Sequence, residues 1–169
     1  MSMIANCLIR ATRADDAEAI ADIYNHYISN SIVTFEEQPV SIKDINSRIL
    51  EATSGNLPHL VVEADKRVVG YAYASKWKGR CSYRYSVEVT VYLAPDAGGR
   101  GYGSKLYEML FAELRERSYH VALAGISLPN DASIALHERF GMEKVAHMKE
   151  VGFKFGNWVD VGYWQVLLQ

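Results

Sequence analysis

The sequence predicts a single α/β domain, built around a mixed sheet, that spans residues 1–169. Segments with strand and helix periodicity follow one another along the chain, with no repeat, low-complexity segment or linker between them. Residues 59–77 have the pattern of an antiparallel hairpin. Residues 120–127, "HVALAGIS", form a continuous apolar run that is typical of a strand covered on both faces. A chain of 169 residues can bury a core without disulfides or a metal ion.

The first predicted elements are a short strand and an amphipathic helix. Residues 7–12, "CLIRAT", have the composition of the strand. Residues 15–28 carry apolar side chains at helical spacing. Asp15 and Glu18 have the spacing of a capping box, which predicts that Asp15 caps this helix.

An irregular link and a second helix come next. Pro39 interrupts any regular element within the link "SIVTFEEQPVS". Ser41 is the predicted cap of a helix over residues 42–53, and Gly55 follows its end.

The middle of the chain is predicted to be three strands. Residues 59–64, "HLVVEA", and residues 68–77, "VVGYAYASKW", flank the polar turn "DKR" and form the hairpin. After a basic and aromatic stretch, residues 86–94, "SVEVTVYLA", form the third strand.

The last third alternates helices and strands. A helix is expected over residues 103–117, followed by the apolar strand 120–127. A short helix over residues 129–141 ends at Gly141, which is well placed as its C′ residue. Residues 143–168 are predicted to form two more strands, separated by "GN".

Composition excludes several classes of function. A net charge of −2 argues against broad binding of nucleic acid, which needs an excess of Lys and Arg. Cys7 and Cys81 have no metal-like spacing, the histidines form no cluster, and no metal site is expected. No signal peptide and no apolar stretch long enough to cross a bilayer are evident, so we expect a cytoplasmic protein that does not bind membranes.

A loop with four glycines, "LAPDAGGRGYGSK", separates the third strand from the following helix. Gly98 and Gly103 have the separation of a phosphate-binding P-loop, but Ser104 and Lys105 follow in the wrong order. The dinucleotide fingerprint GxGxxG is absent, and the loop lies in mid-chain after a hairpin rather than in a first βα turn. A plain helix-start loop is the remaining structural interpretation.

A loop that ends Gly-Tyr-Gly after a strand with a lone Glu resembles the acetyl-CoA loop of the GCN5-related N-acetyltransferases (GNAT). The stretches "IYNHYI", "TFEEQP", "VVGYAYASKWK", "LPNDASIALHERFGM" and "VGFKFGNWVDVGYWQ" resemble the phosphinothricin and methionine sulfoximine N-acetyltransferase branch. The likeness runs from about Ile9 to Gln165. It implies the GNAT fold, a twisted, mostly antiparallel sheet flanked by helices, with acetyl-CoA as co-substrate. Gly98 departs from the family, which usually has Gln or Arg there.

Glu88 is the candidate catalytic base. Alternation along the strand places Glu88, Thr90 and Tyr92 on one face, and a carboxylate there is costly to bury without a role or a partner. On the pattern alone, a solvated face or a salt bridge with Arg84 explains Glu88 equally well. The resemblance assigns it the removal of a proton from the substrate amine. Val89 departs from most relatives, which carry His or Ser there.

The resemblance also implies the cofactor-binding residues. The strand after Glu88 is expected to splay from its neighbour, so that its backbone N–H groups bind the thioester carbonyl and the pantetheine arm. Loop amides, the positive end of the following helix and a helix-capping amide are expected to complete the site. The implied residues are Val91, Leu93, Gly99, Arg100, Gly101, Tyr102, Gly103, Ser104 and Asn130.

His137, near the end of the last helix, is a second catalytic candidate. The wider superfamily usually has Tyr at this position, and the branch that this chain resembles carries His. An imidazole could donate a proton to the departing thiolate or relay one from the amine. A packed or solvated histidine is the alternative interpretation.

Substrate recognition is predicted from two stretches. Arg80 and Arg84 belong to a basic, aromatic stretch before Glu88, and either guanidinium could fork onto a small anionic amino acid. A solvated hairpin end explains each of them as well. Phe35 and Glu36 match a stretch that covers the acceptor site in relatives, where they either contact substrate or pack.

We therefore expect an acetyl-CoA-dependent N-acetyltransferase that acts on a small amino acid analogue by direct attack, without a covalent acyl-enzyme. The resemblance further implies a homodimer. Two alternatives remain open, namely an acetyltransferase for peptide N-termini or protein lysines, and a non-catalytic acyl-CoA-binding domain.

Overall fold

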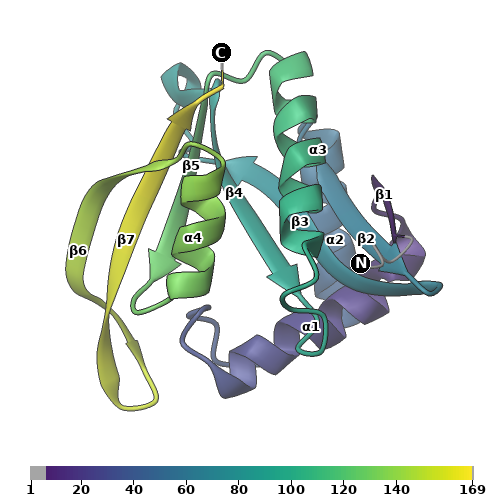
Figure 1. Cartoon of the computed structure of the whole chain (residues 1–169), viewed down its shortest axis with the longest axis horizontal. Helices are drawn as coiled ribbons and strands as arrows, with labels where there is room; N and C mark the ends of the chain where they lie inside the picture. The colour runs from purple at the N-terminus through teal and green to yellow at the C-terminus, as the bar shows by residue number, and fades with distance from the viewer. Residues whose placement is uncertain (1–6, 169) are drawn as a thin grey trace, which may run out of the picture.

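A seven-stranded sheet organises the protein in a computed structural model that describes residues 7–168 (Figure 1). The strand order is β1-β2-β3-β4-β5-β7-β6, and every neighbouring pair is antiparallel except β4 and β5. This confirms the predicted mixed, mostly antiparallel sheet. The strands are β1 (Cys7–Ala11), β2 (His59–Ala64), β3 (Arg67–Lys76), β4 (Ser86–Leu93), β5 (Val121–Ser127), β6 (Glu143–Lys154) and β7 (Asn157–Leu167).

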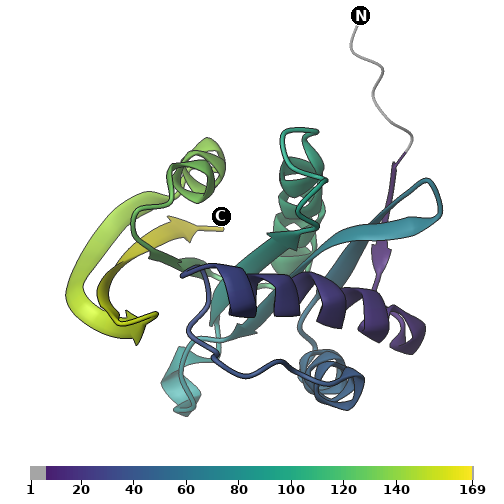
Figure 2. The same ribbon diagram turned by 90° about the horizontal axis from the view of Figure 1, so that it is seen from below.

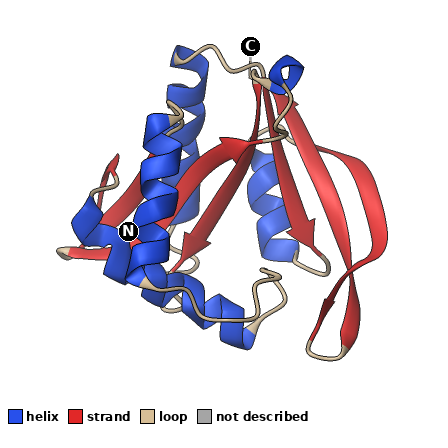
Figure 3. Cartoon of the chain, turned by 180° about the vertical axis from the view of Figure 1, so that it is seen from behind, coloured by secondary structure: helices blue, strands red, loops and turns tan. Residues whose placement is uncertain are grey.

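Helices cover both faces of the sheet. Figure 2 shows α1 and α2 on one face, and α3 and α4 on the other. Seen from behind, α1 and α2 lie in front of the strands (Figure 3). The helices are α1 (Ala17–Asn30), α2 (Ile42–Ser54), α3 (Tyr102–Glu116) and α4 (Asp131–Arg139), with short 3₁₀ turns at Ala14–Asp16 and Cys81–Tyr83.

The helix ends follow the sequence signals except at the start of α1, and Gly55 is the C-cap residue of α2, as predicted. Ser41 caps α2, and Gly141 adopts a φ of 77° after α4, as predicted. The capping box at Asp15 is wrong, because a 3₁₀ turn precedes α1 and moves its start onward. Asp16 instead accepts a hydrogen bond from the Arg13 backbone N–H at 2.7 Å.

His59 is buried against the tyrosines of β3. Its ring stacks on Tyr73 at a centroid distance of 5.2 Å, and its Nδ1 lies 2.8 Å from the Thr12 hydroxyl. Burial lowers the pKa of His59 to about 4. The imidazole is therefore neutral in the folded protein at neutral pH.

We expect the free energy of unfolding to decrease as the pH decreases, because His59 is buried in its neutral form. Between pH 6.5 and pH 4 the His59 imidazole binds a proton in the unfolded chain but stays neutral in the folded protein. Acid therefore favours unfolding. The loss reaches about 3 kcal/mol at pH 4. Urea unfolding of the wild type and of His59→Gln at pH 7.5 and pH 4.5 measures it. Equal pH dependence in both proteins would contradict the assignment.

Candidate active site

Strands β4 and β5 separate in the middle of the sheet. They pair only where Ser86–Glu88 faces Val121–Leu123, although both strands continue well beyond these residues. Figure 1 shows the two arrows diverging from this point. The splay implied by the resemblance is therefore present, and it begins at Glu88.

The gap between the strands receives backbone donors from β4. The Ala94 N–H donates to the Val69 carbonyl on the β3 side at 2.9 Å. Because successive residues of a strand direct their N–H groups to opposite edges, the amides of Val91 and Leu93 point into the gap. The Leu93 carbonyl, which leaves the strand at the same edge as the Leu93 N–H, accepts a hydrogen bond from the Tyr27 hydroxyl of α1 at 2.6 Å.

A cavity of about 300 Å³ fills this gap, and we call it the β4–β5 cavity. Ser127 contributes the only buried side-chain oxygen or nitrogen within residues 7–168 that has no hydrogen-bond partner. An unpaired buried hydroxyl and a row of backbone donors suit a polar ligand that carries carbonyl groups. The predicted site residues that line this cavity are Val91, Leu93, Gly103, Asn130 and His137.

The glycine loop stands at the end of this cavity. Gly99 and Gly101 adopt φ values of 73° and 77°, which L-residues rarely adopt, and α3 begins directly after Gly101. A Cβ on Gly98, Gly99 or Gly101 would meet nothing within 4 Å, so the loop presents its backbone to open space. These donors and the helix N-terminus fit the pyrophosphate of acetyl-CoA.

Within the loop, the side chains divide into two groups. Tyr102 is buried in the core, so only its backbone can contribute to a ligand site. Arg100 is exposed at the tip of the loop. Ser104 lies in the first turn of α3 and is half-buried.

We expect Gly101→Ala to weaken acetyl-CoA binding roughly tenfold. A Cβ at this φ costs about 1–2 kcal/mol, and relief of that strain would turn the first amides of α3 away from the phosphates. Gly98→Ala is the matched control, because Gly98 has ordinary backbone angles and open space around it. Calorimetric titration with acetyl-CoA measures both variants, and equal affinities would contradict the prediction.

Glu88 is half-buried where the two strands part. Burial raises its pKa, while a hydrogen bond from the Gly125 backbone N–H and the charge of Lys78 lower it in part. The predicted alternative, a salt bridge with Arg84, is not formed. Arg84 lies over the Tyr85 ring and donates to the Cys81 carbonyl. A carboxylate whose pKa is raised by burial and that lies between two cavities suits a general base.

His137 is buried and held at both nitrogens. Its Nδ1 lies 2.7 Å from the Ser133 carbonyl oxygen, which only accepts, so Nδ1 carries the proton. Nε2 therefore accepts a hydrogen bond from the Tyr107 hydroxyl at 2.8 Å. Burial lowers the pKa of His137 and keeps the ring neutral. Asn130 caps α4 by accepting from the Ser133 N–H at 3.2 Å.

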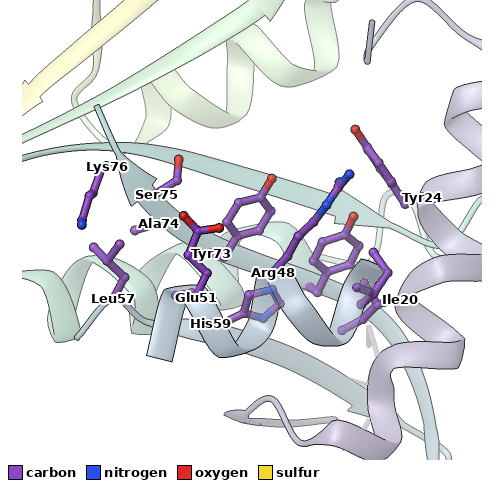
Figure 4. A pocket seen from close by; sticks show the side chains of 13 residues that line it. Ile20, Tyr24, Arg48, Glu51, Leu57, His59, Tyr73, Ala74, Ser75 and Lys76 are labelled. Carbon is purple, nitrogen blue, oxygen red and sulfur yellow. The ribbon is translucent and has the colours of Figure 1, made fainter. Parts of the chain in front are cut away.

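A second cavity, of about 240 Å³, lies between α2 and strands β2 and β3, and we call it the α2 cavity (Figure 4). Tyr73 lines it and is the register partner of Thr90, which lines the β4–β5 cavity. Ser75 also lines the α2 cavity and is the register partner of Glu88. Glu88 itself lines neither cavity, but Gly125 lines the β4–β5 cavity, so Glu88 has a neighbour in each of the two cavities.

The structure separates the four predicted substrate residues. Phe35 packs on Gly152, where an added Cβ would lie 2.3 Å from two ring atoms. Glu36 binds Arg48 of α2 at 2.6 Å. Arg80 and Arg84 are exposed in the β3–β4 connection and line neither cavity.

Sequence reasoning missed Arg48, Lys78 and Tyr107. Arg48 has a signal in the sequence, since it stands three residues after Ile45 on the apolar face of its helix. In the sequence, Tyr107 has the helical spacing of an ordinary core residue. Its contact with His137 is visible only in the fold. Within residues 7–168, no group of three metal-ligating side chains gathers and no helix is long and apolar enough to cross a membrane.

Residues 9–162 match the family model described as acetyltransferase (GNAT) domain. The chain belongs to the GNAT acetyltransferase family. This membership confirms the predicted fold and the predicted enzyme class, an acyltransferase.

Similar proteins place this GNAT domain in the expected branch. It is 38% identical to phosphinothricin N-acetyltransferase of Streptomyces coelicolor, over 95% of this chain and 96% of the relative. It is 37% identical to L-methionine sulfoximine/L-methionine sulfone acetyltransferase of Salmonella typhimurium, over 95% of this chain and 94% of the relative. The Salmonella typhimurium protein yncA, solved with acetyl-CoA, superposes with a TM-score of 0.94 at 35% identity. The superposition covers 96% of this chain and 94% of that protein.

Proposed function

We propose that the protein transfers the acetyl group of acetyl-CoA to the amine of a small amino acid analogue, such as phosphinothricin, methionine sulfoximine or methionine sulfone. The position of Glu88 carries the proposal, because its neighbours Ser75 and Gly125 line two different cavities. The β4–β5 cavity has the backbone donors for the acetyl donor, and the α2 cavity is left for the amine. The names of the relatives support the same reaction.

Acetyl-CoA supplies an activated thioester, and the residues of this chain bind and orient it. The amides from Gly99 to Ser104 hold the pyrophosphate, with Arg100 as an added charge, and Asn130 contacts the pantetheine arm. The Val91 and Leu93 amides face the thioester carbonyl and stabilise negative charge on its oxygen. Glu88 takes one proton of the ammonium group, and the amine nitrogen then attacks the thioester carbon directly within a ternary complex. The C–S bond breaks, CoA leaves as the thiolate, and the thiolate takes the second proton that the nitrogen loses.

His137 is proposed to relay a proton from the amine rather than to give its own proton to the thiolate. Its neutral ring has no proton on Nε2, and this nitrogen already accepts from the Tyr107 hydroxyl. The second proton of the amine would reach His137 through that hydroxyl, which passes its own proton to Nε2 as it receives another, and the reverse transfer would deliver the proton to the CoA thiolate. This role rests on geometry at the β4–β5 cavity, which both residues line.

Thiol release from acetyl-CoA tests the proposed function. The panel contains phosphinothricin, methionine sulfoximine, methionine sulfone, common amino acids, a polyamine and a basic peptide. We expect turnover only with the amino acid analogues. Turnover with the peptide alone would favour a peptide or lysine acetyltransferase. Binding of acetyl-CoA without any turnover would favour a non-catalytic acyl-CoA-binding domain.

We further propose a cytoplasmic homodimer that forms through β6 and β7. β6 is an edge strand, and large apolar side chains on this pair of strands are exposed. Among them, Phe153 and Trp158 pack on each other with centroids 4.8 Å apart. Exposed apolar clusters of this kind are typical of protein interfaces. Light scattering is expected to give a dimer for the wild type and a monomer for Trp158→Glu, with unchanged circular dichroism.

A further inference from the structure

The α2 cavity has a floor of parallel rings and a polar rim. The His59 ring lies at an interplanar angle of 4° to Tyr71 and 10° to Tyr73, and the two tyrosine rings lie at 6° to each other. Figure 4 shows the polar ends of Arg48, Tyr73 and Ser75 pointing to the same side of the cavity. Such a site, with apolar walls and a few convergent polar groups, is typical of small-molecule recognition.

Arg48 is the cation that α2 brings to this rim. Its side chain is 43% exposed, its Nη2 binds Glu36 at 2.6 Å, and its guanidinium lies 5.6 Å from the centre of the Tyr24 ring. A guanidinium has five N–H donors in a planar fork, and Glu36 accepts one of them in this structure. Arg48 is thus held in place by Glu36 and Tyr24 at the edge of the cavity, with donors for a further acceptor.

The spacing along β3 connects Arg48 to the reacting centre. Ser75 is the register partner of Glu88, and Tyr73 stands two residues earlier, about 7 Å along the strand. Arg48 lies over the cavity beside Tyr73 (Figure 4). An amino acid with its amine at Glu88 therefore directs an extended side chain along the tyrosine rings toward Arg48.

We propose that the α2 cavity receives the side chain of the acceptor amino acid and that Arg48 binds the terminal oxygens of that side chain. This inference rests on the proposed function and adds the specificity-determining residue. The ligand class is an α-amino acid whose side chain ends in a sulfone, sulfoximine or phosphinate group. Sulfone and phosphinate oxygens accept hydrogen bonds that a thioether accepts only weakly.

Methionine sulfone and methionine test this directly, because they differ only in the two oxygens. We expect the wild type to prefer the sulfone at least tenfold in kcat/KM. Arg48→Met should abolish that preference by raising KM for the sulfone, while KM for acetyl-CoA stays unchanged. Arg67→Met is the matched control, since Arg67 is also exposed and pairs with an acidic residue, Asp96, at 2.6 Å. A preference that survives in Arg48→Met would overturn the proposal.

A second variant and a binding measurement separate this inference from the proposed reaction. Ala52→Leu narrows the cavity from α2 and should weaken both methionine compounds, but not alanine. Calorimetry in the presence of CoA compares the binding of the sulfone and of methionine without any turnover. No thiol release with any amine would overturn the proposed function alone. Equal binding of the two compounds by the wild type would overturn the assignment of Arg48, with or without turnover.

Discussion

Replacement of Glu88 by Gln is expected to lower kcat by roughly 10²- to 10⁴-fold, the contribution typical of a general base. The amide has nearly the shape of the carboxylate, so the strand and the acetyl-CoA site should keep their geometry. Gly125 donates its N–H to Glu88, and a Gln carbonyl oxygen can accept the same hydrogen bond. Only the capacity to take a proton is lost.

Thiol release and acetyl-CoA titration measure the two parts of this prediction. Glu113→Gln is the matched control, because Glu113 is also a partly buried carboxylate but lies on α3, where it pairs with Arg117 at 2.5 Å. We expect the control to match the wild type, and Glu88→Gln to retain acetyl-CoA affinity within about twofold. Unchanged turnover in Glu88→Gln would exclude this residue as the base.

The pH dependence of kcat/KM in the wild type is an independent test of Glu88 as the base. Burial raises the pKa of Glu88, so the carboxylate is lost at a higher pH than for an ordinary Glu. With kcat/KM requiring the charged form, activity should fall as pH decreases through this raised pKa. A profile that stays flat down to the ordinary pKa of Glu would contradict a base in this environment.

The fold could be predicted because its signals are local. Alternation along "SVEVTVYLA" and the apolar run "HVALAGIS" depend on near neighbours, and both segments became strands that lie side by side. The start of α1 was missed, since the salt bridge between Asp16 and Arg10 of β1, at 2.8 Å, is a tertiary contact. The extent of the domain over residues 1–169 stays a prediction.

The residues of the candidate site also fall into two groups, those that local motifs predict and those that only tertiary packing reveals. Glu88 and the glycine loop follow one another in the sequence, so motifs could find them. Arg80 lies near Glu88 in the chain, but the 3₁₀ turn at Cys81–Tyr83 leaves it exposed outside both cavities. Arg48 meets Glu36 only because α2 folds back over the sheet. Contacts of this kind depend on packing, which a single sequence does not reveal.

Lys154 provides the most distant of these contacts and holds residues 34–36, the segment that we expect to cover the acceptor site. Its buried ammonium donates to the Thr34 carbonyl at 2.7 Å, across 120 residues of sequence. The next residue, Phe35, lies on Gly152 of the same strand, β6. Glu36 then reaches Arg48 at the rim of the α2 cavity. Strand β6 therefore positions residues 34–36.

Gly152→Val is expected to lower kcat/KM for the amine roughly ten- to hundredfold. An added Cβ would lie 2.3 Å from two atoms of the Phe35 ring, so the ring and its segment must move. Overpacking of this kind costs about 1–3 kcal/mol, and each 1.4 kcal/mol corresponds to about tenfold. Acetyl-CoA affinity should not change, because neither Gly152 nor Phe35 lines the β4–β5 cavity.

Phe35→Ala supplies the control, because it removes the ring with which the new side chain collides. If Gly152→Val acts only through Phe35, the double variant should be no worse than Phe35→Ala alone, and the two effects will not add. Steady-state kinetics on the four proteins, with thermal unfolding to confirm that each is folded, completes the cycle. Additive losses would mean that Gly152 matters for β6 itself, and wild-type kinetics in Gly152→Val would show that the segment is not held by this contact.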